Sequence, residues 1–591
     1  MCGILGITPL IRESAFAEAA HGFAYRGPDA YGQLERDGVL LGHHRLSILD
    51  VAARSDQPMV SADGRYAIVF NGEIYNFQEI KQTLASDYPF QTTSDTEVLL
   101  AAYARYGRSL TRHLRGMYAF AIHDRETKQI TLFRDEVGIK PLYYAHLGEL
   151  FCFASEAKGV IHLLATQGIT PTLNETAWDL FWAFGYIPSP LTLGKEILKL
   201  ERGHGACFDL TTKHLEIFEA TKREEEDLRL STATLTQLIE QSVLDHLIAD
   251  RPVGLFFSGG TDSSLIAAVL HKHGINLKTF SLLMPGNDVD EHYIRAIREH
   301  LGLQGELLSF GKNELQSALD LIQSRIDEPT GDSSIFPTTY LSQVASKDVK
   351  VVLSGEGGDE LFLGYHRQQS LARIHGKALP FSRALLDQLR LLSTSSFVNR
   401  VVAKGYLGSQ DAAGFYLNQL SLLREQTPRT VWHAGRTWLE QLSCAPTEID
   451  QAIALENDLL RKIDLATSYA SIEGRVPLLD PRLIRYASRV APNDHLTDGI
   501  LKYQLKQVLS TYLPTTLTER PKAGFGMQQA LLKSHTGFQT AVQSAWKDLK
   551  PFHAFSPDLA RAIERRLTQA NVGTAIITLR SALRAYSFLD E

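Results

Sequence analysis

The stretch Phe256-Phe257-Ser258-Gly259-Gly260-Thr261-Asp262-Ser263-Ser264 determines how the second half of the chain folds. It follows residues 252–255, which have the apolar composition of a buried strand, and it precedes residues 265–270, which begin a helix. A strand that passes through a glycine turn into a helix exposes free backbone N–H groups, and the helix dipole favours an anion there. The two glycines allow a phosphate to approach the backbone closely. A carboxylate at Asp262 would repel that phosphate unless a cation lay between them, so the sequence predicts a polyphosphate with Mg²⁺.

This turn differs from the phosphate-binding loop that ends in Gly-Lys-Ser or Gly-Lys-Thr, because no lysine follows its glycines. It resembles instead the pyrophosphate loop, SGGxDS, of the ATP pyrophosphatases, which activate a carboxylate or carbonyl with AMP and release pyrophosphate. An ordinary strand–turn–helix with a serine N-cap is the alternative interpretation. The resemblance implies an ATP site formed by Phe257, Ser258, Gly259, Gly260, Asp262, Ser263, Leu282, Ser354 and Gly355.

The size and composition of the chain limit what it can be. At roughly 100–200 residues per domain, 591 residues predict two to four domains. The 44% hydrophobic and 21% charged residues are typical of a soluble globular protein, and the net charge of −7 argues against nucleic-acid or anionic-membrane partners. No stretch approaches the roughly 20 apolar residues of a membrane span, and we expect no signal peptide. The four cysteines are far apart and match no metal pattern, so we expect a cytoplasmic location without a disulfide framework.

A cysteine stands at position 2, directly after the initiator methionine. A small second residue permits removal of that methionine, which would give Cys2 both a thiol and a free α-amine. An amine with a pKa of about 8 is a suitable base for the neighbouring thiol. The start of a buried strand over residues 2–7 is the alternative interpretation, and these residues alone do not decide between the two.

The rest of the first half favours the nucleophile, because eight motifs follow Cys2 in order. They are Arg26–Asp29, Gly42–Ile48, Asn71–Asn76, Ser94–Glu97, Gly116–Ala121, Arg134-Asp135, Gly138–Tyr144 and Phe153–Glu156. Together they resemble the N-terminal-nucleophile glutaminase domain of class II amidotransferases, although Tyr25 stands where that family usually has His. The resemblance implies a stacked αββα arrangement. Short apolar stretches such as residues 66–70 and 119–123, separated by turn residues, are typical of such a β-rich domain.

The resemblance assigns chemistry to these motifs. Cys2 attacks the side-chain amide of glutamine, and the side chain of Asn71 and the backbone N–H of Gly72 stabilise the oxyanion. A guanidinium suits the carboxylate of glutamine, and carboxylates suit its ammonium. Read in isolation, Arg45 and Asp95 are equally compatible with a pair of surface charges. The implied glutamine-binding residues are Arg45, Leu46, Ile48, Asn71, Gly72, Glu73 and Asp95.

Strand and helix patterns alternate after the pyrophosphate loop. Strands are predicted over 277–283, 305–309 and 349–353, and helices over 291–300 and 314–326. Such alternation predicts a doubly wound parallel sheet, with ligands at the carboxyl ends of its strands. Polar stretches follow three of these ends, at 258–264, 327–334 and 354–360.

The third stretch, Ser354-Gly-Glu-Gly-Gly-Asp-Glu360, closely matches the asparagine synthetase pattern. Asp359 is a second carboxylate for Mg²⁺ and partners Asp262. Glu356 is positioned to deprotonate an incoming ammonium or to orient an attacking amine. An acidic, glycine-rich surface turn is the alternative interpretation.

The remainder of the chain is predicted to be mostly helical, and it contains further blocks of the same family at 462–464, 471–480, 501–503 and 520–526. Lys522 is predicted to stabilise charge on the adenylate and pyrophosphate, with an ordinary surface lysine as the alternative. Two positions depart from the family. Leu465 stands where Arg is usual, and Gly474 replaces Ala or a branched residue; we expect both to lie where the acceptor pocket is shaped.

Residues 2–526 as a whole resemble the glutamine-hydrolysing asparagine synthetases. The resemblance implies a class II glutamine amidotransferase domain over 2–215 and an ATP pyrophosphatase domain with a helical extension over 230–591. It implies ATP and Mg²⁺ as cofactors, small-molecule substrates and a homodimer. Ammonia released at Cys2 would pass through an internal channel to an aspartyl adenylate, giving asparagine, AMP and pyrophosphate.

Three alternatives stay open. The same machinery could amidate another carboxylate, such as a sugar uronate or a biosynthetic intermediate, and Leu465 favours this alternative. An intramolecular amide-forming cyclase of the β-lactam or lasso-peptide kind is disfavoured by the complete glutaminase set. A non-catalytic protein on the same scaffold is disfavoured by the intact pyrophosphate loop.

Overall fold

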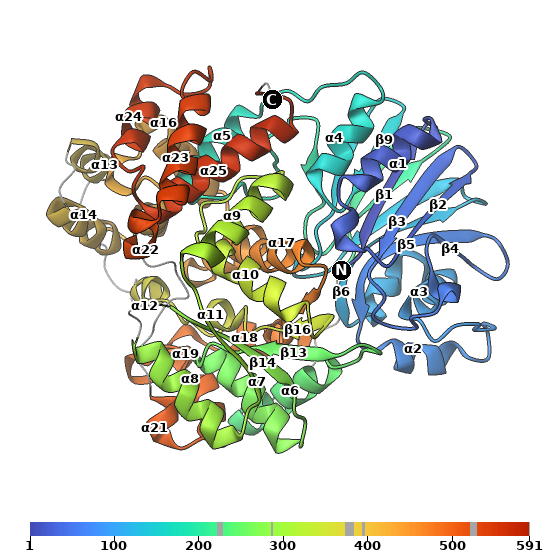
Figure 1. Cartoon of the computed structure of the whole chain (residues 1–591), viewed down its shortest axis with the longest axis horizontal. Coiled ribbons are helices and arrows are strands. Elements are labelled where there is room, and N and C mark those ends of the chain that lie inside the picture. The colour runs from blue at the N-terminus through green and yellow to red at the C-terminus, as the bar shows by residue number, and fades with distance from the viewer. Residues whose placement is uncertain (222–228, 285–287, 373–382, 393–395, 520–528, 590–591) are drawn as a thin grey trace.

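Figure 1 shows the computed structural model, which describes residues 1–221, 229–284, 288–372, 383–392, 396–519 and 529–589. Three sheets organise these residues. Two six-stranded sheets come from residues before 220, and a five-stranded sheet comes from the second half. The N-terminus lies at the centre of the view, where the blue elements of the first half meet the second half (Figure 1).

The first two sheets are antiparallel and stack face to face. One has the order β10 (Leu198–Lys199), β8 (Tyr143–Leu147), β9 (Leu150–Ala154), β1 (Gly3–Thr8), β3 (Val39–Arg45), β2 (Ala30–Arg36). The other has the order β12 (Leu215–Glu219), β11 (His204–Asp209), β7 (Gln129–Arg134), β6 (Gly116–Asp124), β5 (Tyr66–Ile74), β4 (Met59–Val60). Alternate side chains of both sheets, among them Ile4, Val69 and Leu132, fill the layer between them.

Helices cover the outer faces of both sheets. α1 (Glu13–His21) and α4 (Ala157–Ala165) pack on the first sheet, while α2 (Phe77–Leu84) and α3 (Asp95–Tyr106) pack on the second. This arrangement confirms the predicted αββα fold. β12 extends the second sheet past residue 215, and residues 222–228 lie outside the described part of the chain, so the division at 2–215 and 230–591 stays a prediction.

The third sheet is wholly parallel, as the alternation of strands and helices predicts. Its order is β15 (Gly305–Ser309), β14 (Lys278–Leu283), β13 (Val253–Phe256), β16 (Val351–Leu353), β17 (Glu473–Arg475). The helices that connect or precede its strands are α6 (Thr232–Asp245), α7 (Thr261–Lys272), α8 (Asp288–Leu301), α9 (Lys312–Arg325) and α10 (Ile335–Ala345).

The rest of the second half is helical, as expected. Its helices are α11 (Gly358–Leu361), α12 (His366–Ala372), α13 (Arg383–Leu392), α14 (Ser396–Gly408), α15 (Ala412–Leu420), α16 (Arg429–Glu440), a π-helical segment (Asp450–Leu460), α17 (Arg461–Tyr469), α18 (Pro481–Arg489), α19 (Pro492–His495), α20 (Tyr503–Leu509), α21 (Thr515–Thr518), α22 (Gln529–Ser534), α23 (Thr536–Leu549), α24 (Pro557–Glu564) and α25 (Ala570–Ala585). One helix from the first half, α5 (Glu175–Phe184), packs against α16 (Figure 1).

The parallel sheet touches the first half through the amino ends of its strands. Leu46 and Ile48, which follow β3, form an apolar cluster with Val351 of β16, and Val253 of β13 packs against it. The Asp250 carboxylate accepts a hydrogen bond from the backbone N–H of Asp50, at 2.8 Å. The carboxyl ends of the same strands point away from this contact. Because a parallel strand rises about 3.3 Å per residue, strands of three or four residues separate the two ends by roughly 10–13 Å.

Candidate active sites

The thiol of Cys2 lies between β3 and β5. The backbone N–H of Cys2 donates to Asn71 Oδ1 at 3.0 Å, and Sγ lies 3.9 Å from the carbonyl oxygen of Leu46. Burial raises the pKa of the thiol, and the N-terminal amine opposes that rise. The sequence therefore placed Cys2, Leu46 and Asn71 together correctly, and the thiol needs a base to become a nucleophile.

The two predicted oxyanion donors, Asn71 and Gly72, are adjacent on β5. The side chain of Asn71 is fully buried, and its Nδ2 has no hydrogen-bond partner among the described residues. A buried donor without a partner is costly unless a ligand supplies the acceptor. The neighbouring Gly72 has φ +156°, and a Cβ there would lie 2.1 Å from the carbonyl oxygen of Met117, so only glycine fits.

Arg45 is buried under the loop that follows β3, and it already holds a carboxylate. Its guanidinium donates to the carbonyl oxygens of Leu49, Asp50 and Ala52 and to Asp56 Oδ1 at 2.6 Å. Backbone carbonyls therefore fix the fork in place, and a substrate carboxylate would take the position that Asp56 occupies at Nη1.

Glu73 and Asp95 are both buried beside this site. Asp95 Oδ2 accepts from the backbone N–H of Ile74 at 3.0 Å, and burial raises the pKa of Asp95 to about 6. Glu73 Oε2 accepts from Arg475 Nη2 at 2.7 Å, whereas Oε1 is buried without a partner in the described structure. Two buried carboxylates, one of which has an oxygen without a partner in the described structure, make a suitable site for an ammonium group.

The second site is a cavity of about 870 Å³ at the carboxyl ends of the parallel strands. All the predicted ATP-binding residues line it except Gly259. Gly259 has φ +64°, and a Cβ there would lie 2.9 Å from the backbone nitrogen of Ile294, so the turn itself requires glycine. Ser258 Oγ lies 3.1 Å from Ser263 Oγ and accepts from the N–H of Gly260, which shapes the turn at the start of α7.

The two predicted metal ligands converge on one cation, the Lys502 ammonium. It lies 2.9 Å from Asp359 Oδ1 and also contacts Asp262 Oδ2. Two carboxylates facing one positive centre beside a helix N-terminus fit Mg²⁺ carried in with a polyphosphate. Lys502 belongs to one of the blocks that resemble the family, but nothing in the sequence alone indicated that it reaches across 240 positions to Asp262.

Glu356 lines the same cavity and pairs with Lys462 Nζ at 3.3 Å. Lys462 also lies 3.6 Å from Asp332 Oδ2. Burial and the neighbouring Asp332 raise the pKa of Asp458, another cavity residue, to about 8. The sequence alone indicated no role for Lys462 or Asp458, because the local pattern of residues does not show how deeply either side chain is buried.

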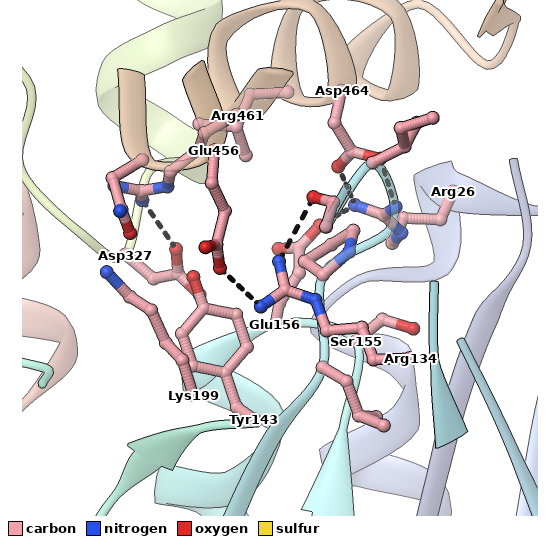
Figure 2. Close-up of a pocket in the computed structure, with 16 residues that line it drawn as sticks. Arg26, Arg134, Tyr143, Ser155, Glu156, Lys199, Asp327, Glu456, Arg461 and Asp464 are labelled. Carbon is pink, nitrogen blue, oxygen red and sulfur yellow. Dashed lines mark hydrogen bonds and ion pairs between the residues drawn. The ribbon is translucent and has the colours of Figure 1, made fainter. Parts of the chain in front are cut away.

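A smaller pocket of about 30 Å³ lies between the two halves, and Figure 2 shows its lining. Arg26 Nη1 contacts Glu156 Oε1 and Asp464 Oδ2, both at 3.0 Å, and Arg134 Nη1 contacts Glu456 Oε1 at 2.6 Å. These ion pairs join the antiparallel sheets to the π-helical segment and α17.

The structure corrects three expectations about position. Leu465 lines the pocket between the halves and not the large cavity, together with Arg461 and Asp464 of the same helix, α17. Gly474 lies within β17, close to Ile463 and Thr467, and it does not line the large cavity either. The stretch 327–334 divides: Asp327 lines the small pocket, whereas Asp332 lines the large one. Lys522 lies outside the described residues.

Comparison with protein families divides the chain into the same two halves. A model described as a glutamine amidotransferase domain matches residues 1–218, and a model described as asparagine synthase matches residues 234–576. The chain belongs to the asparagine synthase family. It is thus an asparagine synthetase-family ligase with a glutamine amidotransferase half and an asparagine synthase half.

Curated relatives support this assignment over most of their length. The putative glutamine-hydrolyzing asparagine synthetase of Mycobacterium tuberculosis (strain ATCC 25618 / H37Rv) is 33% identical, with 87% of this chain and 84% of that protein covered. Asparagine synthetase 1 of Bacillus subtilis is 30% identical (89% and 87% covered), and asparagine synthetase B of Escherichia coli is 28% identical (89% and 82% covered). A solved B. subtilis glutamine phosphoribosylpyrophosphate amidotransferase shares 16% identity over 52% of this chain and 65% of its own, with a TM-score of 0.29, too low to bear on the fold.

Throughout the described part of this family member, no helix is long and apolar enough to span a membrane.

Proposed function

We propose that the chain is a glutamine-hydrolysing asparagine synthetase: it transfers the amide nitrogen of glutamine to the side-chain carboxylate of aspartate and converts ATP to AMP and pyrophosphate. The observation that carries the proposal is the pairing of two complete sites in one chain. The buried Asn71 Nδ2, next to Cys2, has no hydrogen-bond partner among the described residues. The pyrophosphate loop lines a cavity of about 870 Å³.

In the glutaminase half, the Cys2 sulfur attacks the amide carbon of glutamine. Once the initiator methionine is removed, the α-amine of Cys2 takes the thiol proton and later protonates the leaving ammonia. The Asn71 side chain and the Gly72 N–H receive the developing oxyanion. Arg45 receives the carboxylate of glutamine, and the carboxylates of Glu73 and Asp95 receive its ammonium. Water then cleaves the thioester to release glutamate.

In the synthetase half, a carboxylate oxygen of aspartate attacks the α-phosphorus of ATP, and pyrophosphate leaves. The backbone of the pyrophosphate loop and the start of α7 hold the leaving pyrophosphate. Asp262 and Asp359 would hold Mg²⁺, which neutralises phosphate charge when bound. Lys522 is proposed to stabilise the same charge. Ammonia attacks the acyl carbon, AMP leaves, and Glu356 accepts the surplus proton.

Ammonia must travel between the sites without meeting bulk water, where it would be protonated. The pocket between the halves supports such a route, since it is enclosed by residues of both halves and lies on the opposite face of α17 from the large cavity. The resemblance also implies a homodimer and a cytoplasmic location, which remain predictions.

The decisive experiment is product analysis after incubation with ATP, Mg²⁺, glutamine and aspartate. Equal amounts of pyrophosphate, glutamate and asparagine support the proposal. Glutamate without aspartate-dependent pyrophosphate would keep the glutaminase half and reject aspartate as the acceptor. Other carboxylates, beginning with sugar uronates, would then be tested with the same pyrophosphate assay.

A further inference from the structure

One residue of the parallel sheet reaches into the glutamine site. Arg475, the last residue of β17, is fully buried, and its Nη2 donates to Glu73 Oε2 at 2.7 Å across 402 positions of the chain. Glu73 follows Asn71 and Gly72 directly on β5. The guanidinium of Arg475 therefore contacts the carboxylate that is nearest in sequence to the proposed oxyanion donors.

The other donors of Arg475 fix its position. Nη1 donates to the carbonyl oxygens of His246 at 2.9 Å and Ile248 at 2.7 Å, and Nε donates to Glu473 Oε1 at 2.8 Å. The planar guanidinium is thus held by three acceptors of the second half and presents its remaining edge to Glu73. A fork held in this way leaves little freedom for the bond that it makes.

Glu73 uses its two oxygens differently. Oε2 is bound to Arg475, whereas Oε1 is buried without a partner in the described structure. The bound oxygen fixes the orientation of the carboxylate, and the other oxygen remains for a ligand cation. Neutral Glu73 would offer a much weaker site for an ammonium group, since the attraction depends on the negative charge.

We propose that Arg475 is a positioning residue for glutamine: it orients Glu73, so that the second half of the chain completes the ammonium site of the first. This inference rests on the proposed function. It adds a residue of the synthetase half to the machinery that recognises glutamine.

The charges around Glu73 agree with this role. Burial raises the pKa of Glu73, and Arg475 is the largest influence that opposes the rise. Asp95 and Glu473 raise the pKa further, whereas Lys140 lowers it. Tyr75 lies under the guanidinium, and His246 stacks on Tyr75 with ring centroids 3.9 Å apart. With the guanidinium lost, the remaining neighbours favour the neutral acid.

The test uses the full chain with Arg475→Lys, Glu73→Gln and the double variant. Arg475→Lys keeps the positive charge but cannot reproduce four hydrogen bonds, so the KM for glutamine should rise about tenfold while kcat for glutamine hydrolysis changes less than threefold. Synthesis with ammonia in place of glutamine should stay within threefold of the unaltered chain.

The double variant separates positioning from a structural role. If Arg475 acts through Glu73, Arg475→Lys should raise the KM no further in the Glu73→Gln background. Arg436→Lys is the matched control, since Arg436 is a buried arginine whose Nη2 contacts Asp411 Oδ2 at 2.6 Å in the helical region, and it should leave the KM for glutamine unchanged.

An unchanged KM in Arg475→Lys, an equal loss of glutamine- and ammonia-dependent synthesis, or additive effects in the double variant would overturn the inference alone. Absence of glutamine hydrolysis by the unaltered chain would overturn the proposed function and the inference together.

Discussion

The two candidate sites are built in opposite ways. The glutamine site is made from residues on or beside the antiparallel strands β1, β3 and β5 and at the start of α3, and the polar groups of Arg45 and Asp95 are buried and bonded to backbone atoms. The nucleotide site is a wide cavity at the ends of parallel strands, where side chains from distant segments meet over about 870 Å³. The polar groups of the first site are therefore largely fixed before its substrate arrives, although a substrate carboxylate would have to replace Asp56 at Arg45. In the second, ligand charge must replace ion pairs such as those of Lys502.

Cys2→Ala tests whether the second site works without the first, and its expected effect is the largest. Removal of the sulfur should lower glutamine-dependent synthesis by at least about 10³-fold, because the thioester cannot form. Synthesis with ammonium chloride should stay within about threefold. The measurement is pyrophosphate release with each nitrogen source, and loss of both activities would contradict the two-site comparison.

Asn71→Ala probes the preorganisation of the first site. Loss of one oxyanion donor should lower kcat for glutamine hydrolysis by about 10²–10³-fold with a smaller change in KM. Ammonia-dependent synthesis serves as the internal control for folding. A change confined to KM would mean that Asn71 binds ground-state glutamine and does not act on the oxyanion.

Asp359→Asn tests the second site by removing one of its charged groups. Loss of one of the two carboxylates at Lys502 should lower pyrophosphate release by about 10²-fold with either nitrogen source, because charge on the phosphates is less well neutralised. Glutamine hydrolysis in the absence of ATP should be unaffected. Raising the Mg²⁺ concentration should recover part of the lost rate, and failure to do so would argue against a metal-binding role.

Leu465→Arg tests the small pocket between the sites. A long cation there would face Arg26, Arg134 and Arg461, so it should lower glutamine-dependent synthesis about threefold to tenfold while each half-reaction stays near its original rate. The measurement is the ratio of asparagine formed to glutamate formed. Leu465→Met is the volume-matched control, and an unchanged ratio in Leu465→Arg would exclude this pocket from the ammonia route.

The smallest expected effect is on the pH dependence of glutamine binding. Asp95 is ionised above its pKa of about 6 and neutral below it. The KM for glutamine should therefore rise roughly fourfold from pH 7 to pH 5.5, as the ammonium loses this partner. Asp95→Asn should raise the KM at pH 7 and make it independent of pH over this range. A rise of equal size in the variant would assign the titration to another group.

The sequence predicted the fold well because local patterns encode it. The parallel sheet and the turn at Gly259 follow from strand patterns, glycine positions and helix starts, whereas the αββα layers were implied by the family resemblance. The residues expected at the glutamine site came from the resemblance, and the structure brings two of them, Cys2 and Asn71, into contact. The partners of Asp262, Glu356 and Glu73 were not, because Lys502, Lys462 and Arg475 reach them across large separations in sequence. Leu465 was misplaced for a related reason: a departure from a motif identifies a position on a helix but not which cavity it faces.

One helical run forms the wall between the two cavities. Asp458, Leu459, Lys462 and Ile463 face the nucleotide cavity, whereas Glu456, Asn457, Arg461, Asp464 and Leu465 face the pocket between the halves. A single inserted or deleted residue in Asp450–Tyr469 would turn every later side chain by about 100°. Some side chains that line one cavity would then line the other. Evolution of a new acceptor and evolution of nitrogen delivery are therefore tied to the same twenty positions, and a graft of acceptor specificity from a relative should transfer this run whole.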